Sequence, residues 1–221
     1  MNQEHDFEPV RGLPARLPIG ETLRWQGSPD WKAFAIRVFH VRKIAGWFAL
    51  LMAWRIATAV HDGVPLVDIV PTLAILAGLG AAAVAMFCGF AIGIARTTVY
   101  TVTERRVVMR FGMAMPMIVN LPYSQINGAA LRAGGEGIGD IPLVLADDRP
   151  LTFAVLWPHA RPWHLSRPQP MLRCIPDAQG VAQILAAGLA TTATAGQREL
   201  SSVPAATIGR PVHTGTLATA S

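Results

Sequence analysis

The residues that could carry chemistry do not combine into a known catalytic pattern. The sequence has no GxSxG nucleophile elbow, no HExxH helix, no paired CxxC and no P-loop. The run GGEGIG at 134–139 lacks the Lys-Ser/Thr of a phosphate loop, and Asp140 leads into an expected strand. We interpret this run as a hairpin or connecting loop, and we expect neither enzymatic activity nor a bound cofactor.

Histidines are the side chains best suited to hold a metal ion or a pigment. His40 and His61 flank the apolar runs described below, so no histidine lies where a mid-membrane pigment ligand would. His159 and His164 are close enough in the sequence to share a metal ion, but no third ligand is evident. We therefore favour hydrogen-bonded structural histidines and predict no metal site.

Arg55 carries a charge within a long apolar run. A charge inside a bilayer is costly and usually has a partner. Asp68 lies at a similar depth at the start of the second apolar run, which predicts an Arg55–Asp68 ion pair. The alternative is that the Arg55 side chain extends to the headgroups of the far leaflet. Neither arrangement implies catalysis.

The elements that position these residues follow from the distribution of charge. Of the 221 residues, 52% are hydrophobic and 15% are charged, against about 25% charged in soluble proteins. Residues 44–60 are apolar apart from Arg55, and residues 69–95 carry no charge. At about 1.5 Å per residue the second run is roughly 40 Å long, enough to cross a bilayer core of about 30 Å. We predict transmembrane helices at 44–60 and 69–95, joined by a short non-cytoplasmic loop at 61–68.

Basic residues lie at the outer ends of both runs. Four Lys or Arg residues lie within 32–43 and Arg96 follows the second run, whereas the loop at 61–68 has none. The positive-inside rule therefore places both termini in the cytoplasm. The net charge of +5 comes mainly from arginine and does not indicate nucleic-acid binding.

Small residues recur every four positions in the second run. They are Ala77, Ala81, Ala85, Gly89 and Gly93. Such a row allows another helix backbone to approach closely. Packing against the protein's own first helix is the simpler interpretation, and a docking face for a partner helix is the alternative.

Residues 28–43, which follow an N-terminal segment at 1–27, form a basic amphipathic stretch. Ser28 followed by Pro29 predicts a helix start. A basic amphipathic helix beside a membrane span is typical of an interfacial helix on anionic lipid. Simple flanking charge is the alternative.

After residue 95 the pattern changes from helix to strand. Runs at 97–102 and 106–111 predict a hairpin. Further short strands are expected at 115–121, 125–132, 140–146, 151–156 and 171–175. Asp177 opens an amphipathic helix to about Ala190, and residues 191–221 are expected to form a disordered tail. The predicted fold class is a membrane α-helical hairpin plus a small cytoplasmic α+β domain at 96–190, with about seven antiparallel strands and a C-terminal helix.

Several motifs together resemble one family. They are LPIGE at 17–21, LRWQGSP at 23–29, FHVR at 39–42, YTVTERRV at 100–107, LPYSQI at 121–126 and WPH at 157–159. The chain resembles the PuhB family of photosynthetic-complex assembly proteins of purple bacteria. The cytoplasmic part of that family is similar to bacterial pleckstrin-homology-like domains. The resemblance covers roughly residues 17–190.

The resemblance implies a non-enzymatic assembly factor for the reaction centre and its core light-harvesting antenna, in the inner (intracytoplasmic) membrane. The expected partners are reaction-centre or core-antenna subunits and anionic lipid, with self-association left open and no nucleic acid. Candidate partner contacts are Trp25, His40, Arg42, Trp157 and Trp163. Two alternatives stay open: a generic membrane-anchored pleckstrin-homology-like module, and a bacteriochlorophyll-handling protein with His40 or His61 as ligand.

Overall fold

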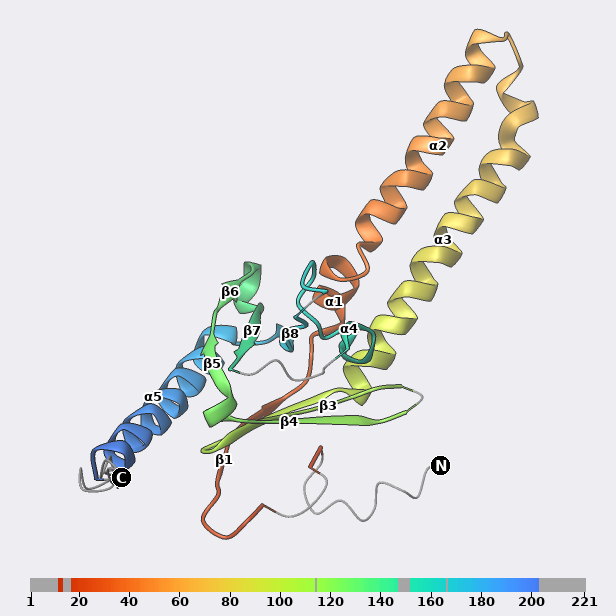
Figure 1. The fold of residues 1–221 in the computed structure, drawn as a ribbon. Coiled ribbons are helices and arrows are strands. Elements are labelled where there is room, and N and C mark those ends of the chain that lie inside the picture. The colour runs from red at the N-terminus through yellow and green to blue at the C-terminus, as the bar shows by residue number, and fades with distance from the viewer. Residues whose placement is uncertain (1–11, 14–16, 114, 147–151, 166, 203–221) are drawn as a thin grey trace, which may run out of the picture.

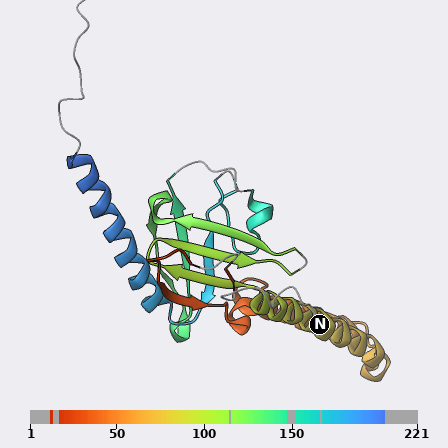
Figure 2. The ribbon, with the colours of Figure 1, turned by 90° about the horizontal axis from the view of Figure 1, so that it is seen from below.

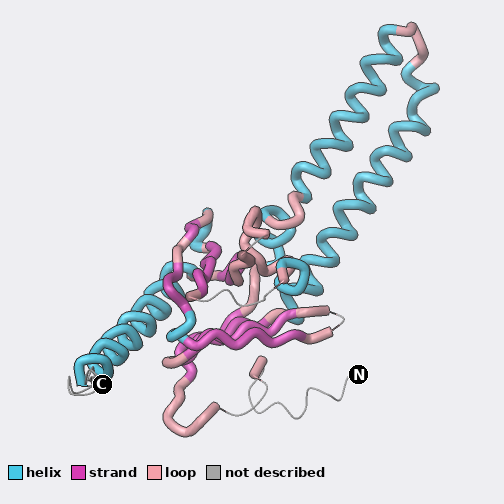
Figure 3. The backbone as a smooth tube through the Cα atoms, viewed as in Figure 1, coloured by secondary structure: helices cyan, strands magenta, loops and turns pink. Residues whose placement is uncertain are grey.

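The structure of the protein is a computed structural model, and it describes residues 12–13, 17–113, 115–146, 152–165 and 167–202. A long helical hairpin projects from a small β-rich domain, and a further helix leaves that domain on the opposite side (Figure 1). In Figure 3 the helices of the hairpin are cyan and the strands, which all lie in the small domain, are magenta. The predicted fold class, two long apolar helices followed by a small β domain with a C-terminal helix, is confirmed.

The hairpin consists of α2 (Val41–His61) and α3 (Leu66–Thr97). An 18-residue window in each helix has a mean hydropathy of 1.3 in α2 and 2.2 in α3, and both helices are long and apolar enough to cross a membrane. Gly80 of α3 lies against α2, since a Cβ atom there would come within 2.9 Å of the Phe48 ring. A glycine at this point allows the two helices to pack closely.

The helix α3 ends two residues after the predicted end of the second span, and it is longer than a bilayer crossing requires. Its 32 residues correspond to about 48 Å, roughly 18 Å more than a bilayer core needs. Ala91 and Ile94 near its end are buried in a cluster with α1 (Trp31–Arg37). The lower third of α3 therefore belongs to the β-rich domain as much as to the hairpin.

The helix predicted for residues 28–43 is divided in two. Its first part, α1, is capped by Asp30 rather than Ser28, and the Asp30 carboxylate accepts a hydrogen bond from Ala33 N at 2.7 Å. His40 then adopts a left-handed conformation (φ 54°, ψ 38°) before α2 begins. The apolar face of α1 is buried against α3 and Cys174, so it is covered by protein. The sequence pattern showed an apolar face but not what covers it.

The described residues form eight strands in two antiparallel sheets. The first sheet has the order β1 (Leu23–Gly27), β2 (Val99–Thr103), β3 (Arg106–Phe111), β4 (Met117–Pro122). In the second, β5 (Ile126–Ala129) and β6 (Arg132–Ala133) pair with β7 (Gly139–Leu145), which also pairs with β8 (Met171–Ile175). The predicted number was about seven: β1 was not expected, the predicted strand at 125–132 is divided into β5 and β6, and the one at 151–156 is not a strand.

Two of the predicted strands differ from the structure. Residues 125–132 are interrupted, since a 3-10 helix, η2 (Tyr123–Gln125), precedes β5 and β6 begins at Arg132. The strand expected at 151–156 is a short helix, α4 (Phe153–Leu156), and residue 151 lies outside the described residues. Apolar runs this short do not distinguish a helix from a strand. A second 3-10 helix, η3 (Gly135–Gly137), forms the loop before β7.

The core lies between the two sheets and α5 (Ala178–Ser202). Its largest fully buried side chains include Tyr100, Met109, Leu143 and Leu185. The helix α5 continues beyond Ala190, so the predicted tail is wrong for residues 191–202, and residues 203–221 lie outside the described residues. Alanine, glutamine, arginine and leucine are strong helix formers, which explains the extension. Figure 2 shows α5 leaving the domain well away from the hairpin.

Candidate functional site

The row of small residues on α3 faces away from α2. Ala77, Ala81, Ala85 and Gly89 are exposed, and a Cβ atom added at Gly89 would meet nothing within 4 Å. The row ends at Gly93, where an added Cβ atom would lie 2.6 Å from the Met113 sulfur. Packing against the protein's own first helix was the simpler interpretation, and the structure contradicts it, because α2 lies on the face that contains Gly80.

Arg55 and Asp68 form no ion pair with each other among the residues that the structure describes. Asp68 lies in the first turn of α3, where a carboxylate stabilises the helix N-terminus. Arg55 lies six residues before the end of α2, which corresponds to about 9 Å along the axis. The predicted pairing fails because the two residues lie at different depths.

An aromatic cluster joins the base of the hairpin to the domain. It consists of Phe34, Phe39, Phe87, Trp157 and His159, and we call it the joint cluster. The Phe39 ring centroid lies 5.6 Å from that of Phe87 and 6.4 Å from that of Trp157. Phe34 contacts both Phe39 and His159, at 5.7 and 5.9 Å. The joint cluster therefore runs from α3 through α1 into the segment that follows α4.

His159 is the buried end of the joint cluster. Its Nδ1 lies 2.6 Å from the Tyr100 hydroxyl, and its Nε2 lies 3.3 Å from Thr98 Oγ1. Burial lowers the pKa of His159 to about 3, and the Arg173 charge acts in the same direction. The ring is therefore neutral near pH 7, as the interpretation of a hydrogen-bonded structural histidine requires.

Backbone and carboxylate contacts tie α1 to the second sheet. Asp30 N donates to the Cys174 carbonyl at 2.8 Å, and Cys174 N donates to the Asp140 carboxylate at 2.7 Å. The Arg37 guanidinium donates to the Ile138 carbonyl at 3.1 Å. Burial raises the pKa of the Cys174 thiol to about 12, so it is protonated and unreactive. These contacts join α1 to the second sheet.

The candidate partner contacts occupy different environments. Trp25 is half-buried and packs against the domain core, so its main role is structural. His40 is exposed at the left-handed joint before α2, and Arg42 is exposed in the first turn of α2. Trp157 and Trp163 are 57% and 93% exposed. Four of the five are therefore available at the surface.

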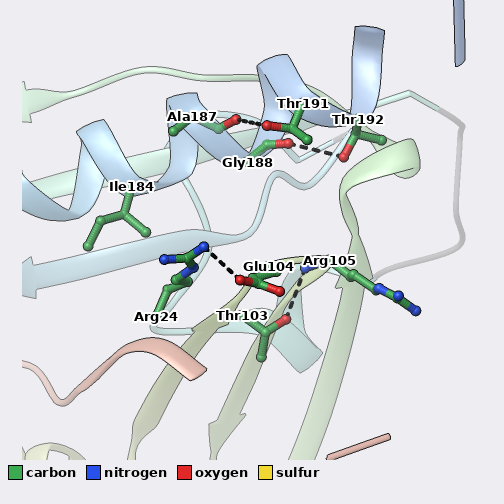
Figure 4. Close-up of a pocket in the computed structure, with 9 residues that line it drawn as sticks. All are labelled: Arg24, Thr103, Glu104, Arg105, Ile184, Ala187, Gly188, Thr191 and Thr192. Carbon is green, nitrogen blue, oxygen red and sulfur yellow. Dashed lines mark hydrogen bonds and ion pairs between the residues drawn. The ribbon is translucent and has the colours of Figure 1, made fainter. Parts of the chain in front are cut away.

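A groove of about 640 Å³ lies between the β2–β3 turn and α5. Figure 4 shows Arg24 and Glu104 next to each other on the strand side of the groove, opposite α5, and their ion pair measures 2.6 Å. The hydroxyl groups of Thr191 and Thr192 donate to carbonyls of their own helix at 2.9 and 3.0 Å. A hydrogen bond from Thr22 and the Arg24 charge hold the pKa of Glu104 below its usual value. Each of these polar side chains therefore already has a partner within the protein.

In the part of the chain that the structure describes, no three His, Cys, Asp or Glu side chains lie close enough to hold a metal ion. The sequence missed Phe39 and His159 as the residues that connect the hairpin to the domain. Both lie in motifs that carry the family resemblance, FHVR at 39–42 and WPH at 157–159, but nothing in those motifs indicates that the two residues belong to one aromatic cluster.

Comparison with known proteins assigns the class of this chain. The Bacterial PH domain family matches residues 36–189. The chain belongs to this family. The matched region contains the hairpin as well as the strands that follow it, so the family resemblance is not confined to the β-rich domain.

A curated protein of Rhodobacter capsulatus is also similar. It is described as an uncharacterized 23.7 kDa protein in the puhA 5′ region, and it is 41% identical over 186 residues. The aligned region covers 83% of this chain and 86% of that protein. No solved structure matches this bacterial PH domain protein.

Proposed function

We propose that the protein is a non-enzymatic assembly factor, of the PuhB kind, for the photosynthetic reaction centre and its core light-harvesting antenna. It would act in the bacterial inner (intracytoplasmic) membrane with both termini in the cytoplasm. The observation that carries the proposal is the relative from the puhA 5′ region, because puhA is a photosynthesis gene. Bacterial genes that act together are commonly neighbours.

The exposed row on α3 supports a mechanism by helix docking. Ala77, Ala81, Ala85 and Gly89 leave a smooth surface on a helix whose opposite face already has its partner in α2. In lipid, small residues favour association because they allow van der Waals contact between helix backbones. A single-span antenna or reaction-centre helix fits this surface, and so does a second copy of the protein.

The β-rich domain would complete the scaffold on the cytoplasmic side. The joint cluster holds it at a set position below the hairpin, and Arg42 at the start of α2 is exposed at the same level. A subunit helix on the α3 row would therefore have its cytoplasmic end beside the domain.

Deletion of the gene tests the role. We expect the near-infrared absorbance of the core complex to fall while pigment synthesis continues. Absorbance equal to that of the parent strain would overturn the proposal and would favour a generic membrane-anchored module.

A pair of substitutions tests the surface. Ala85→Leu with Gly89→Leu adds bulk to the row, and we expect the core-complex yield to fall although the protein still inserts. Leu79→Trp with Met86→Trp is the matched control, because both positions are exposed on α3 but outside the row. Equal yields from the two double variants would refute docking on this face.

A further inference from the structure

Two residue counts place the cytoplasmic boundary of the bilayer on the hairpin. A core of about 30 Å needs about 20 helical residues. Counted from the loop after His61, α2 reaches that depth at its first residue, Val41, and α3 reaches it near Phe87. Phe39 lies just before α2, and its ring is 5.6 Å from the Phe87 ring. Both counts therefore place the cytoplasmic boundary of the bilayer at the level of the Phe39 and Phe87 rings.

The segment 157–170 starts at this level. Trp157 contacts Phe39 at 6.4 Å and still exposes 57% of its surface. In Figure 1 the loop that follows α4 rises to the height of α1, on the side of the domain that carries the hairpin. The loop therefore faces the bilayer, whereas α5 extends away from it.

The base of this loop is closed by hydrogen bonds. Ala160 and Pro170 form a β-bridge, and Arg161 N donates to the Gln169 carbonyl at 2.9 Å. The Arg161 guanidinium also donates to the Gln169 side chain at 2.8 Å. The tip beyond this base is therefore presented by an ordered support.

The tip carries large apolar side chains that the described part of the chain does not cover. Trp163 is 93% exposed and has a positive φ of 66°, and Leu165 is 67% exposed. A positive φ is unusual for a bulky residue and has a conformational cost. Because Trp163 is almost fully exposed, packing within the described chain does not offset that cost.

We propose that this tip inserts into the headgroup region of the cytoplasmic leaflet, with Trp163 and Leu165 entering the lipid and Trp157 at its edge. Tryptophan concentrates at membrane interfaces because its ring is apolar with one polar N–H group. Arg42 and Lys43 are exposed at the first turn of α2, at the same level, where they suit anionic headgroups. Lipid is the occupant because the tip lies level with the bilayer boundary.

Such an insertion would restrict rotation of the domain about the hairpin. The two spans alone set the depth of the domain, whereas a contact beside them also sets its orientation. The inference requires that the hairpin spans the bilayer, but it does not depend on the assembly role.

Photocrosslinking in native membranes tests the proposal. Benzoylphenylalanine replaces Trp163 or Leu165 in the full-length protein, and the adducts are identified by mass spectrometry. Ile19 is the control position, because it is fully exposed and precedes β1 at the end of the domain remote from α3. We expect lipid adducts at 163 and 165 and only background at 19.

Two results would overturn the proposal. One is the absence of lipid adducts at 163 and 165 when the protein is shown to be inserted. The other is an adduct with a reaction-centre or antenna subunit in place of lipid, which would refute lipid insertion while supporting the assembly role. Because all three positions are exposed, we expect the substitutions to leave folding unchanged.

Discussion

His159 stabilises the protein only while it is neutral. Its ring is buried between α1 and the first sheet and bonds to Tyr100 and Thr98. In the unfolded chain a histidine has a pKa of about 6.5, whereas burial lowers the pKa of His159 to about 3 in the folded protein. As the pH falls below about 6.5, the unfolded state takes up the proton first, so stability is lost down to about pH 3.

His159→Gln is predicted to remove this acid sensitivity. The free energy of unfolding of the native protein should fall by up to about 1.4 kcal/mol per pH unit over this window, and this contribution should be missing from the variant. Denaturant unfolding in detergent at several pH values measures it. Tyr100→Phe is the control, because it removes one partner but leaves the histidine buried. Equal pH dependence in native protein and His159→Gln would contradict the assignment.

Glu21 anchors the N-terminal segment to the first sheet. Its carboxylate accepts hydrogen bonds from Arg106 at 2.7 and 2.8 Å and from Thr103 at 2.6 Å. Burial raises the pKa of Glu21, but the bonds from Arg106 and Thr103 outweigh it and leave the pKa below the usual value. The carboxylate is therefore ionised and paired in the folded protein.

Glu21→Gln is predicted to lower the free energy of unfolding by about 1–3 kcal/mol, because it weakens a charged hydrogen-bond network at a buried position. Glu104→Gln is the matched control, since it breaks the solvent-exposed pair with Arg24 and should have far less effect. Chemical denaturation of both variants gives the comparison. A loss for Glu104→Gln as large as that for Glu21→Gln would show that burial is not the deciding factor.

At the scale of elements, the contact between α2 and α3 depends on Gly80. Gly80→Leu is predicted to separate the two helices and lower the melting temperature in detergent, because the new side chain would overlap the Phe48 ring. Gly78→Leu is the control, since a Cβ atom there meets nothing within 4 Å. Equal melting temperatures for the two variants would mean that the helices do not pack at Gly80.

The sequence predicted the elements whose structure depends on the residue pattern within the element itself. The two spans and the strands at 106–111 and 171–175 have clear periods or apolar runs, and the structure places β3 and β8 there. The strand β1 has the sequence LRWQG and exists because it pairs with β2, which lies over 70 residues later. A pairing that distant leaves no signal in five residues.

The candidate site was predictable only in part. The row on α3 is visible in the sequence, but which side of it faces α2 is decided by Gly80 and Phe48. The Arg55–Asp68 prediction assumed that both residues lie at the same depth. It failed because α2 ends six residues after Arg55, whereas α3 begins two residues before Asp68. The burial of His159 depends on α1, which folds against a segment more than 100 residues away in the sequence.

At the scale of the whole molecule, the distribution of basic residues predicts the topology. Asp62→Cys, in the hairpin loop, should react with a membrane-impermeant maleimide added outside intact cells stripped of their outer membrane. Ala186→Cys, exposed on α5, should react only after permeabilisation. The parent protein reports any background from Cys88, because Cys174 is buried. Reversed labelling would place the domain on the opposite side.

The junction between α3 and β2 has a mechanical consequence. Thr98 alone separates the end of α3 from Val99, its side chain is buried, and its N–H donates to the Ile94 carbonyl at 2.9 Å. Because no flexible linker joins α3 to β2, we expect the hairpin and the β-rich domain to move together as one rigid body. A tilt of the hairpin by about 10°, well within the range of membrane helices, moves a point about 50 Å away by about 9 Å. A contact inside the bilayer that tilts the hairpin would therefore displace the far end of α5.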